Sequence, residues 1–306
     1  MRLLLATRTH AAEWRAALRA ALPQADLHVW PEAPDEVDYA LVWKPPPECF
    51  LRVRVARAIA NLGAGADALL ALPTLPANVP VLRLTDAGMA EQMAEYVTLA
   101  VLAAYRERHA YAEQQRERRW VPRTRLRKDA FQVGLLGMGV LGTAVAQALR
   151  PFGFPLAAWT RSAREAPGVT MHAGTDGLAR LLAATSVLVC MLPSTPRTRG
   201  LLDADRLRRL PRGAHVVNVA RGDLVVEEDL LALLDEGHLA TATLDVFRDE
   251  PLPAAHPFWH HPRVVVTPHV SAATLIDVSV AQVAQRIAAH MRGEPVDGLV
   301  DRALGY

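Results

Sequence analysis

A glycine-rich hexapeptide between an apolar run and a helix-forming run constrains this chain more than any other feature. Residues 131–136 have the pattern of a buried strand, and residues 143–149 favour a helix. Between them lies Gly137-Met138-Gly139-Val140-Leu141-Gly142. In such a loop the first glycine permits a tight turn, the second lets the backbone approach a pyrophosphate, and the third lets the helix pack on the strand. The hexapeptide predicts a dinucleotide-binding unit, with a purely structural glycine turn as the alternative.

Short apolar segments alternate with helix-like segments along most of the chain. Such alternation predicts parallel sheets covered by helices, and therefore an α/β fold with two doubly wound units. The expected strands before the loop are residues 3–6, 27–30, 39–43 and 58–62, with a helix over residues 11–21, and those after it are residues 156–159, 187–192, 215–219, 240–245 and 264–267.

Two longer helices are expected outside this alternation. Residues 89–120 predict one connecting helix whose first half is buried, because its apolar residues recur at helical spacing. Residues 274–291 predict a second helix, which Gly293 and Pro295 end. We expect this last helix to return to the N-terminal unit.

The composition excludes several classes of protein. A chain of 306 residues with 51% hydrophobic and 22% charged residues is typical of a globular protein. No apolar run approaches the roughly 20 residues of a membrane span, and no signal peptide is expected. Cys49 and Cys190 are isolated, and the pair His260-His261 has no suitable third ligand, so we expect no disulfide, no metal and a cytoplasmic location. The net charge of +2 and the single aromatic residue in the arginine-rich run 116–128 favour no nucleic-acid partner.

The strand that follows the glycine loop ends without the acidic residue that commonly binds a ribose 2′-hydroxyl. Thr160, Arg161 and Ser162 stand there instead. A carboxylate would repel a 2′-phosphate, whereas an arginine with two neighbouring hydroxyl groups would bind it. NADP is therefore the preferred cofactor and NAD a possible one, unless Arg161 is only a surface residue.

Three chemically distinct side chains follow three later strands. Arg221 follows the strand over residues 215–219, Glu250 lies in the loop after residues 240–245, and His269 follows residues 264–267. Because ligands bind at the carboxyl ends of parallel strands, we expect the three to share one rim. A cation can fix a carboxylate and polarise a ketone, an imidazole can donate a proton, and a neighbouring carboxylate favours the protonated imidazole. This set predicts the reduction of a 2-oxo acid, although each residue alone has a structural interpretation.

The motifs around these residues carry a family resemblance. The order of G-x-G-x-x-G, N-x-A-R-G at 218–222, L-D-V-F-x-x-E-P-L at 244–252 and T-P-H at 267–269 resembles the D-isomer specific 2-hydroxyacid dehydrogenases. Further stretches at residues 39–43, 62–65, 88–93, 153–156 and 300–306 are similar to the glyoxylate/hydroxypyruvate reductase A group within that family. The resemblance covers essentially the whole chain.

The resemblance implies a discontinuous organisation and a set of binding residues. Residues 1–95 and 275–306 would form a flavodoxin-like substrate domain, into which a Rossmann cofactor domain of residues 96–274 is inserted. Arg221, Glu250 and His269 match the catalytic residues. The implied cofactor contacts are the hexapeptide 137–142 and Thr160, Arg161, Ser162, Leu192, Pro193, Val219, Ala220 and Asp245, and the implied substrate contacts are Trp43, Leu62, Gly63, Ala64 and Gly65 together with Arg221 and His269.

The implied activity is the NADPH-dependent reduction of glyoxylate to glycolate and of hydroxypyruvate to D-glycerate, with His269 as proton donor. Such enzymes are typically homodimers that close on their ligands. Two alternatives stay open. One is another D-2-hydroxyacid dehydrogenase, such as a phosphoglycerate-type enzyme, for which the chain offers no room for a regulatory domain after Tyr306. The other is a dinucleotide-sensing binding protein without turnover.

Overall fold

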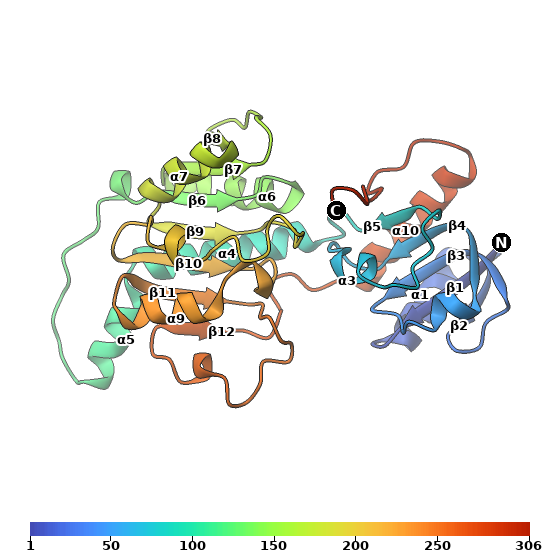
Figure 1. Ribbon diagram of the computed structural model, residues 1–306, viewed down its shortest axis with the longest axis horizontal. Coiled ribbons are helices and arrows are strands. Elements are labelled where there is room, and N and C mark those ends of the chain that lie inside the picture. Colours follow the sequence, from blue (N-terminus) through green and yellow to red (C-terminus); the bar gives the residue numbers. More distant parts are fainter. The chain divides into compact units, whose positions relative to one another are not determined.

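The computed structural model describes residues 1–306, which divide into two compact units (Figure 1). The first unit joins Met1–Met89 to Thr274–Tyr306, and the second consists of Ala90–Ala273. The second unit is thus inserted in the chain of the first. Both are built on purely parallel sheets.

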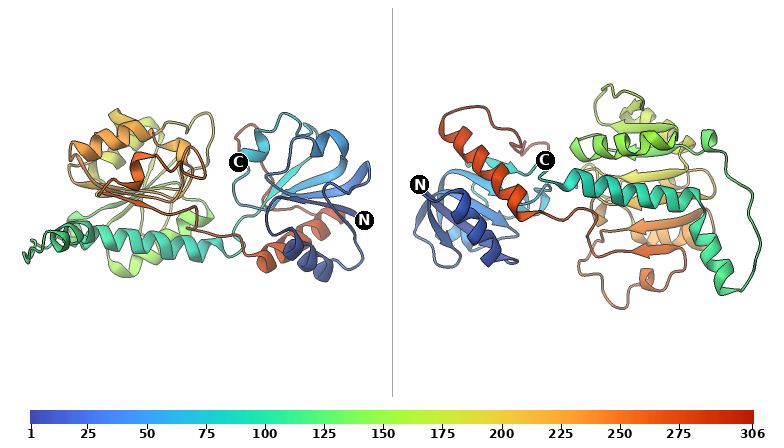
Figure 2. Two further views of the ribbon diagram at one scale, coloured as in Figure 1. Left: turned by 90° about the horizontal axis from the view of Figure 1, so that it is seen from below. Right: turned by 180° about the vertical axis from the view of Figure 1, so that it is seen from behind.

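The first unit contains a five-stranded sheet in the order β2-β1-β3-β4-β5. Helices α1 and α10 cover one of its faces, and the short helices α2 and α3 lie on the other (Figure 2). The hydroxyl of Tyr39 on β3 is hydrogen bonded to Nδ1 of His290 on α10 at 2.9 Å. The C-terminal helix therefore completes the core of the N-terminal unit. The elements are β1 Arg2–Thr7, α1 Ala11–Ala21, β2 Asp26–Val29, β3 Glu36–Trp43, α2 Cys49–Arg52, β4 Arg54–Asn61, α3 Asp67–Leu70, β5 Val81–Arg83 and α10 Ile276–Met291.

The second unit contains a seven-stranded sheet in the order β12-β11-β10-β9-β6-β7-β8. Helices α7, α8 and α9 pack on one face, and α4 and α6 pack on the other (Figure 2). The elements are α4 Met89–Tyr105, α5 Arg108–Arg116, β6 Val133–Leu136, α6 Val140–Leu149, β7 Leu156–Thr160, β8 Thr170–Ala173, α7 Gly174–Ala184, β9 Val187–Cys190, α8 Ala204–Leu207, β10 Ala214–Asn218, α9 Glu227–Asp235, β11 Leu239–Leu244 and β12 Val264–Val266, with four short 3-10 turns elsewhere.

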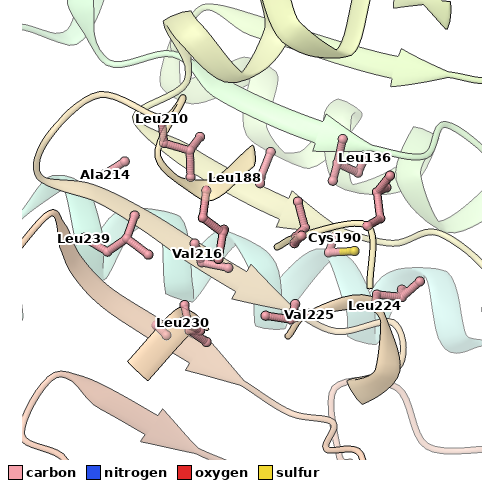
Figure 3. Close-up of a cluster of buried hydrophobic side chains, with 14 of the residues drawn as sticks. Leu136, Leu188, Cys190, Leu210, Ala214, Val216, Leu224, Val225, Leu230 and Leu239 are labelled. Atoms are coloured by element: carbon pink, nitrogen blue, oxygen red, sulfur yellow. The ribbon is translucent and has the colours of Figure 1, made fainter. Parts of the chain in front are cut away.

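Strands β6 and β9 at the centre of the second sheet are buried on both faces, which explains why they read as unbroken apolar runs. On one face, Leu188 and Val216 pack against Leu230 of α9 and Leu210, as the close-up in Figure 3 shows. On the other face, Val133 and Val189 pack against α4 and α6. Two closed cores, one above and one below the sheet, hold the strand ends in fixed positions.

The strand orders confirm the expected fold class. The first sheet has the flavodoxin-like order 2-1-3-4-5, and the second, counted from its own first strand, has the Rossmann order extended by one strand. In the second sheet the order reverses between β6 and β9, and in the first it reverses between β1 and β3. Ligands of open α/β sheets bind beside such reversals, at the carboxyl ends of the strands.

The expected single helix over residues 89–120 is wrong. The structure ends α4 at Tyr105 and starts α5 at Arg108, because Glu107 adopts a left-handed backbone with φ 51°. The Glu107 carboxylate accepts a hydrogen bond from Nε of Arg123 at 2.7 Å, a contact 16 residues away that no local pattern reveals. Helix α5 ends at Arg116, and residues 117–127 form no helix.

Two strands were not expected. Strand β5 has only three residues, and β8, with the sequence Thr-Met-His-Ala, is a half-exposed strand at the edge of the sheet. Neither contains the apolar run that marks a buried strand. The second sheet therefore has one strand more than the sequence predicted.

Candidate functional site

The glycine loop connects β6 to α6, as the sequence predicted. Gly137 has φ +104°, which a side chain would strain, and a Cβ atom at Gly142 would lie 2.3 Å from the carbonyl oxygen of Gly137. At Gly139 a Cβ atom would meet nothing within 4 Å, and this residue precedes the first turn of α6 without a side-chain cap. The two outer glycines are required by packing, while the middle one borders open space. This is the arrangement that a pyrophosphate group needs.

The turn after β9 packs against this loop. The N–H of Met191 donates to the carbonyl of Leu136 at 2.9 Å, and a Cβ atom at Gly137 would lie 3.4 Å from Cδ2 of Leu192. The carbonyl of Pro193 accepts a hydrogen bond from the Thr198 hydroxyl at 2.7 Å. Leu192 and Pro193 therefore lie beside the glycine loop at the point where the strand order reverses.

The segment after β7 has no carboxylate at the strand end and two arginines. The hydroxyl of Thr160 donates to the carbonyl of Ser162 at 2.9 Å, which folds the segment into a turn around the exposed Arg161. Three residues further along, Nη1 of Arg164 donates to the carbonyl of Met138 in the glycine loop at 2.6 Å. The segment is thus tied to the loop by a second cation that sequence reasoning did not single out.

Arg221 follows β10 in a turn that a buried asparagine holds. The Asn218 amide donates to the carbonyl of Arg221 at 2.9 Å, and its oxygen accepts from the N–H of Ala220 at 3.2 Å. Nη1 of Arg221 donates to the carbonyl of Ala220 at 2.6 Å. Val219 and Ala220, two predicted cofactor contacts, are buried in the same turn. The backbone that carries the Arg221 guanidinium is therefore held in place by hydrogen bonds to the buried Asn218 side chain.

The next residue, Gly222, brings the Arg221 turn against the loop that carries Glu250. A Cβ atom at Gly222 would lie 1.9 Å from the carbonyl carbon of Phe247 and 2.2 Å from the nitrogen of Arg248. Only glycine fits there. In the second loop, Oε1 of Glu250 accepts a hydrogen bond from the N–H of Phe247 at 3.2 Å.

His269 and Glu250 form a direct pair. Nδ1 of His269 lies 2.9 Å from Oε2 of Glu250, and the two side chains are 42% and 28% exposed. Because one ring nitrogen is held by the carboxylate, the opposite nitrogen, Nε2, is the atom that can exchange a proton with a ligand. The backbone of His269 is left-handed, with φ 56°, and its N–H donates to the carbonyl of Asp245 at 2.9 Å.

The side chain of Asp245 is fully buried and holds the segment around His269. Its carboxylate accepts hydrogen bonds from the Thr267 hydroxyl at 2.5 Å, the N–H of Val270 at 2.9 Å and the N–H of Ser271 at 2.8 Å. The Thr267 hydroxyl is also bonded to the Tyr96 hydroxyl of α4 at 2.6 Å. The Asp245 carboxylate thus binds the Thr267 side chain before His269 and the backbone after it, a role that the motif alone did not reveal.

Trp43 and residues 62–65 lie together in the first unit. A Cβ atom at Gly63 would lie 2.2 Å from Cζ3 of Trp43, so the indole ring packs directly on the loop backbone. Trp43 ends β3 and the loop follows β4, which places both at the carboxyl ends of adjacent strands. Nζ of the exposed Lys44 lies 5.9 Å from the centre of the indole ring.

The contacts that sequence reasoning missed are of two kinds. Asn218 stands in the same N-x-A-R-G motif as Arg221, and Thr267 in the same T-P-H motif as His269, so both could have been included from their motifs. Arg164 lies three residues after Arg161, in the same non-helical segment. Tyr96 has no local signal, because the hydroxyl group it contacts lies 171 residues away.

No helix in the structure has the length and apolar character required to cross a membrane. The comparisons with known proteins all indicate the same protein family. Residues 98–271 match the family described as D-isomer specific 2-hydroxyacid dehydrogenase, NAD binding domain.

Full-length relatives give a more specific likeness. The chain is 46% identical over 303 residues to glyoxylate/hydroxypyruvate reductase A of Serratia proteamaculans, with 97% of each chain covered. It is also 46% identical over 299 residues to the protein of the same name in Escherichia fergusonii, with 96% of each chain covered.

Solved structures match over the same length. The D-isomer specific 2-hydroxyacid dehydrogenase of Xanthobacter autotrophicus, in complex with NADPH and MES, has a TM-score of 0.94 at 41% identity and matches 100% of this chain and 99% of its own. The NADPH-dependent glyoxylate/hydroxypyruvate reductase of Sinorhizobium meliloti, in complex with NADP and sulfate, has a TM-score of 0.94 at 34% identity, again with 100% of this chain and 99% of its own covered. The family predicted from the four motifs is confirmed: this chain belongs to the D-isomer specific 2-hydroxyacid dehydrogenases.

Proposed function

We propose that this protein reduces small 2-oxo acids, converting glyoxylate to glycolate and hydroxypyruvate to D-glycerate, with NADPH as the preferred hydride donor and NADH as a possible one. The relatives that carry this activity in their names match nearly the whole chain at 42–46% identity. The observation that carries the proposal is the pair of His269 and Glu250, 2.9 Å apart, which leaves one imidazole nitrogen to serve a substrate.

The chemistry divides among three side chains. When bound, NADPH supplies the hydride that reaches the carbonyl carbon of the substrate. His269 in its protonated form donates a proton from Nε2 to the carbonyl oxygen, which receives the electron pair of the broken C=O π bond. Arg221 binds the substrate and stabilises the negative charge that develops on that oxygen. Glu250 orients the imidazole through its contact with Nδ1, and solvent restores the proton of His269 after each turnover.

The second unit offers a consistent cofactor site. The N–H groups at the start of α6 and the open space at Gly139 suit the pyrophosphate, and Arg161 with Thr160 and Ser162 suits a 2′-phosphate. Arg164 adds a second positive charge at the glycine loop. We assign the remaining cofactor contacts to Met138, Val140, Leu141, Leu192, Pro193, Val219 and Ala220. The fully buried Asp245 supports the site indirectly, through the backbone after His269.

The first unit supplies groups for the substrate. The backbone N–H groups of residues 63–65 suit the substrate carboxylate, whereas that of Leu62 donates to the carbonyl of Val42 at 2.8 Å. The Trp43 indole, packed on Gly63, suits a pocket wall. We therefore assign the substrate role to the unit of Met1–Met89 and Thr274–Tyr306 and the cofactor role to the unit of Ala90–Ala273.

A homodimer in the cytoplasm is the state that we propose for the enzyme. In the second unit, α4, α5 and the extended segment 117–127 expose large apolar side chains, notably Trp120 at 98% and Leu99 at 70%. Large apolar side chains left exposed on two helices and the segment that follows them are typical of a surface that a second copy covers. Both cysteines are unpaired and buried, which suits a reducing compartment.

Spectrophotometric turnover with a panel of 2-oxo acids tests this function. The purified protein is mixed with NADPH or NADH and with glyoxylate, hydroxypyruvate, 3-phosphohydroxypyruvate or pyruvate, and the loss of reduced-nicotinamide absorbance is followed. We expect the highest kcat/KM for glyoxylate or hydroxypyruvate with NADPH. A preference for the phosphorylated acid would favour a phosphoglycerate-type enzyme, and binding of NADPH without turnover of any acid would favour a dinucleotide-sensing protein.

A further inference from the structure

The loop of residues 62–65 is bound from one side through its carbonyl groups. The carbonyl of Gly63 accepts hydrogen bonds from the Asn61 amide at 2.9 Å and from the N–H of Leu84 at 3.2 Å. The carbonyl of Gly65 accepts from the same Asn61 nitrogen at 2.9 Å. The carbonyl of Ala64 lies 3.4 Å from Nη1 of Arg83, which also donates to Leu84. Three successive carbonyls are thus held by two side chains.

This arrangement determines where the N–H groups of the loop point. In a trans peptide the N–H and the preceding C=O point in opposite directions. The N–H groups of Ala64, Gly65 and Ala66 are therefore turned away from Asn61 and Arg83, and none of them donates a hydrogen bond within the protein. Successive unpaired N–H groups form a concavity that favours anions.

The loop is also held rigidly. The Asn61 side chain, 3% exposed, lies under it, and the Trp43 ring packs on Gly63 so closely that a Cβ atom there would overlap the ring. An anion would therefore meet N–H groups that need no rearrangement, which lowers the free-energy cost of binding.

Positive charge behind the loop exceeds the negative charge beside it. The half-buried guanidinium of Arg83 forms no ion pair; burial and then the nearby Arg286 lower its pKa, while Asp297 acts in the opposite direction. The Asp297 carboxylate is bound by Arg286 at 2.7 Å, and Arg286 also donates to the carbonyl of Arg83. Two guanidinium groups therefore share one carboxylate, and an anion that binds nearby stabilises the partly desolvated Arg83.

We propose that Asn61 and Arg83 are positioning residues of the substrate-carboxylate site. Asn61 fixes the loop so that its N–H groups face the carboxylate, and Arg83 supplies the charge that makes the loop prefer an anion to a neutral group of the same shape. The inference rests on the proposed function, because the anion in question is the carboxylate of the 2-oxo acid.

Three variants separate these roles. Asn61→Asp keeps the shape of the side chain but removes its donors, and Arg83→Met removes the charge while Arg83→Lys retains it. Arg54→Met is the matched control, because Arg54 is an exposed arginine of the same sheet that pairs with Glu36. Each variant is assayed with glyoxylate and with its neutral methyl ester, and NADPH binding is measured by fluorescence quenching.

We expect Asn61→Asp and Arg83→Met to raise KM for glyoxylate by about 10-fold or more, since a charge-assisted contact contributes roughly 1.5–3 kcal/mol. The change in kcat should be small, and NADPH affinity should stay unchanged. For Arg83→Met the loss should be confined to glyoxylate and be largely restored in Arg83→Lys. An unchanged KM, or an equal loss with the acid and the ester, would overturn the role of Arg83.

Two further measurements keep the inference independent of activity and of folding. If the unaltered protein turns over no 2-oxo acid, the proposed function fails, and calorimetric titration of oxamate in the presence of NADPH then tests the loop. Oxamate should bind at least 10-fold more weakly to Arg83→Met than to Arg54→Met, and equal affinities contradict the inference. If Asn61→Asp unfolds, Asn61→Ser, which can still donate one hydrogen bond, replaces it and should show the same rise in KM to a smaller degree.

Discussion

Nδ1 of His269 lies 2.9 Å from Oε2 of Glu250, while the other carboxylate oxygen of Glu250 accepts the N–H of Phe247 at 3.2 Å. One oxygen of the carboxylate is therefore held by the loop that carries Glu250, and the other oxygen holds the imidazole. This double attachment sets the orientation of the ring and leaves Nε2 as the nitrogen that does not contact Glu250.

Replacing His269 with alanine should lower kcat for glyoxylate reduction by about 100- to 10,000-fold, the range by which a positioned acid accelerates such reactions. Affinity for NADPH should change little. Steady-state kinetics and a fluorescence titration measure the two quantities. A variant that keeps the full rate would remove His269 from the role of proton donor.

Replacing Arg161 with aspartate should reverse the cofactor preference. A charge-assisted hydrogen bond to a 2′-phosphate contributes about 1.5–3 kcal/mol, so kcat/KM with NADPH should fall roughly 10- to 100-fold while that with NADH changes far less. Arg180→Asp, at an exposed position of α7, serves as the control for added negative charge. An unchanged ratio of the two kcat/KM values would show that the 2′-phosphate is bound elsewhere.

Replacing Asp245 with asparagine should destabilise the second unit. The fully buried carboxylate accepts three hydrogen bonds, and an amide would turn a donor toward at least one of those donors, at a cost of about 2 kcal/mol. We expect a lower midpoint of urea unfolding together with a lower kcat, because the same bonds hold the backbone around His269. The exposed Asp205→Asn should leave both values unaltered.

The buried His215 should make the protein sensitive to acid. Burial, and secondarily the neighbouring His109, lowers its pKa from 6.5 to about 3. Between these pH values the unfolded chain binds a proton that the native state does not, so this contribution to the free energy of unfolding is complete above pH 6.5 and declines as the pH falls toward 3. In His215→Gln, which can still bond the Thr241 hydroxyl, urea unfolding should depend less steeply on pH over this range. The exposed His10→Gln should retain the steep dependence.

Replacing Trp120 and Leu99 with glutamate should convert the expected dimer to a monomer, because two charges would have to be buried in the proposed contact. Light scattering coupled to gel filtration measures the mass. Leu51→Glu, at a side chain 73% exposed in the first unit, is the control. A dimer of normal affinity in the double variant would place the contact on another surface.

The parts of the fold that were predictable from sequence are those in which burial or close packing restricts the residue types within a short run of the chain. Strand β9 reads Val-Leu-Val-Cys because both of its faces are covered, and the glycine loop is recognisable because its constraints fall within six residues. Strand β8 was missed because its half-exposed side chains follow no apolar pattern.

The parts that were not predictable depend on partners far apart in the chain. The break between α4 and α5 lies at the left-handed backbone of Glu107, whose carboxylate binds Arg123, 16 residues further along the chain. The proposed catalytic residues could be named from their motifs, whereas the groups around them, such as Tyr96 beside Thr267, are identified only in the folded chain. Sequence motifs mark the groups that carry chemistry more readily than the groups that support them.

At Gly222 the space beside the Phe247–Arg248 peptide admits a hydrogen atom and nothing larger. The turn with Arg221 and the loop with Glu250 are consequently packed as one rigid unit, although the two side chains are 29 positions apart in the sequence. A designer who wishes to alter substrate choice should exchange both loops together as one cassette. In a library that varies only one of the two loops, most variants will not pack against the unchanged loop.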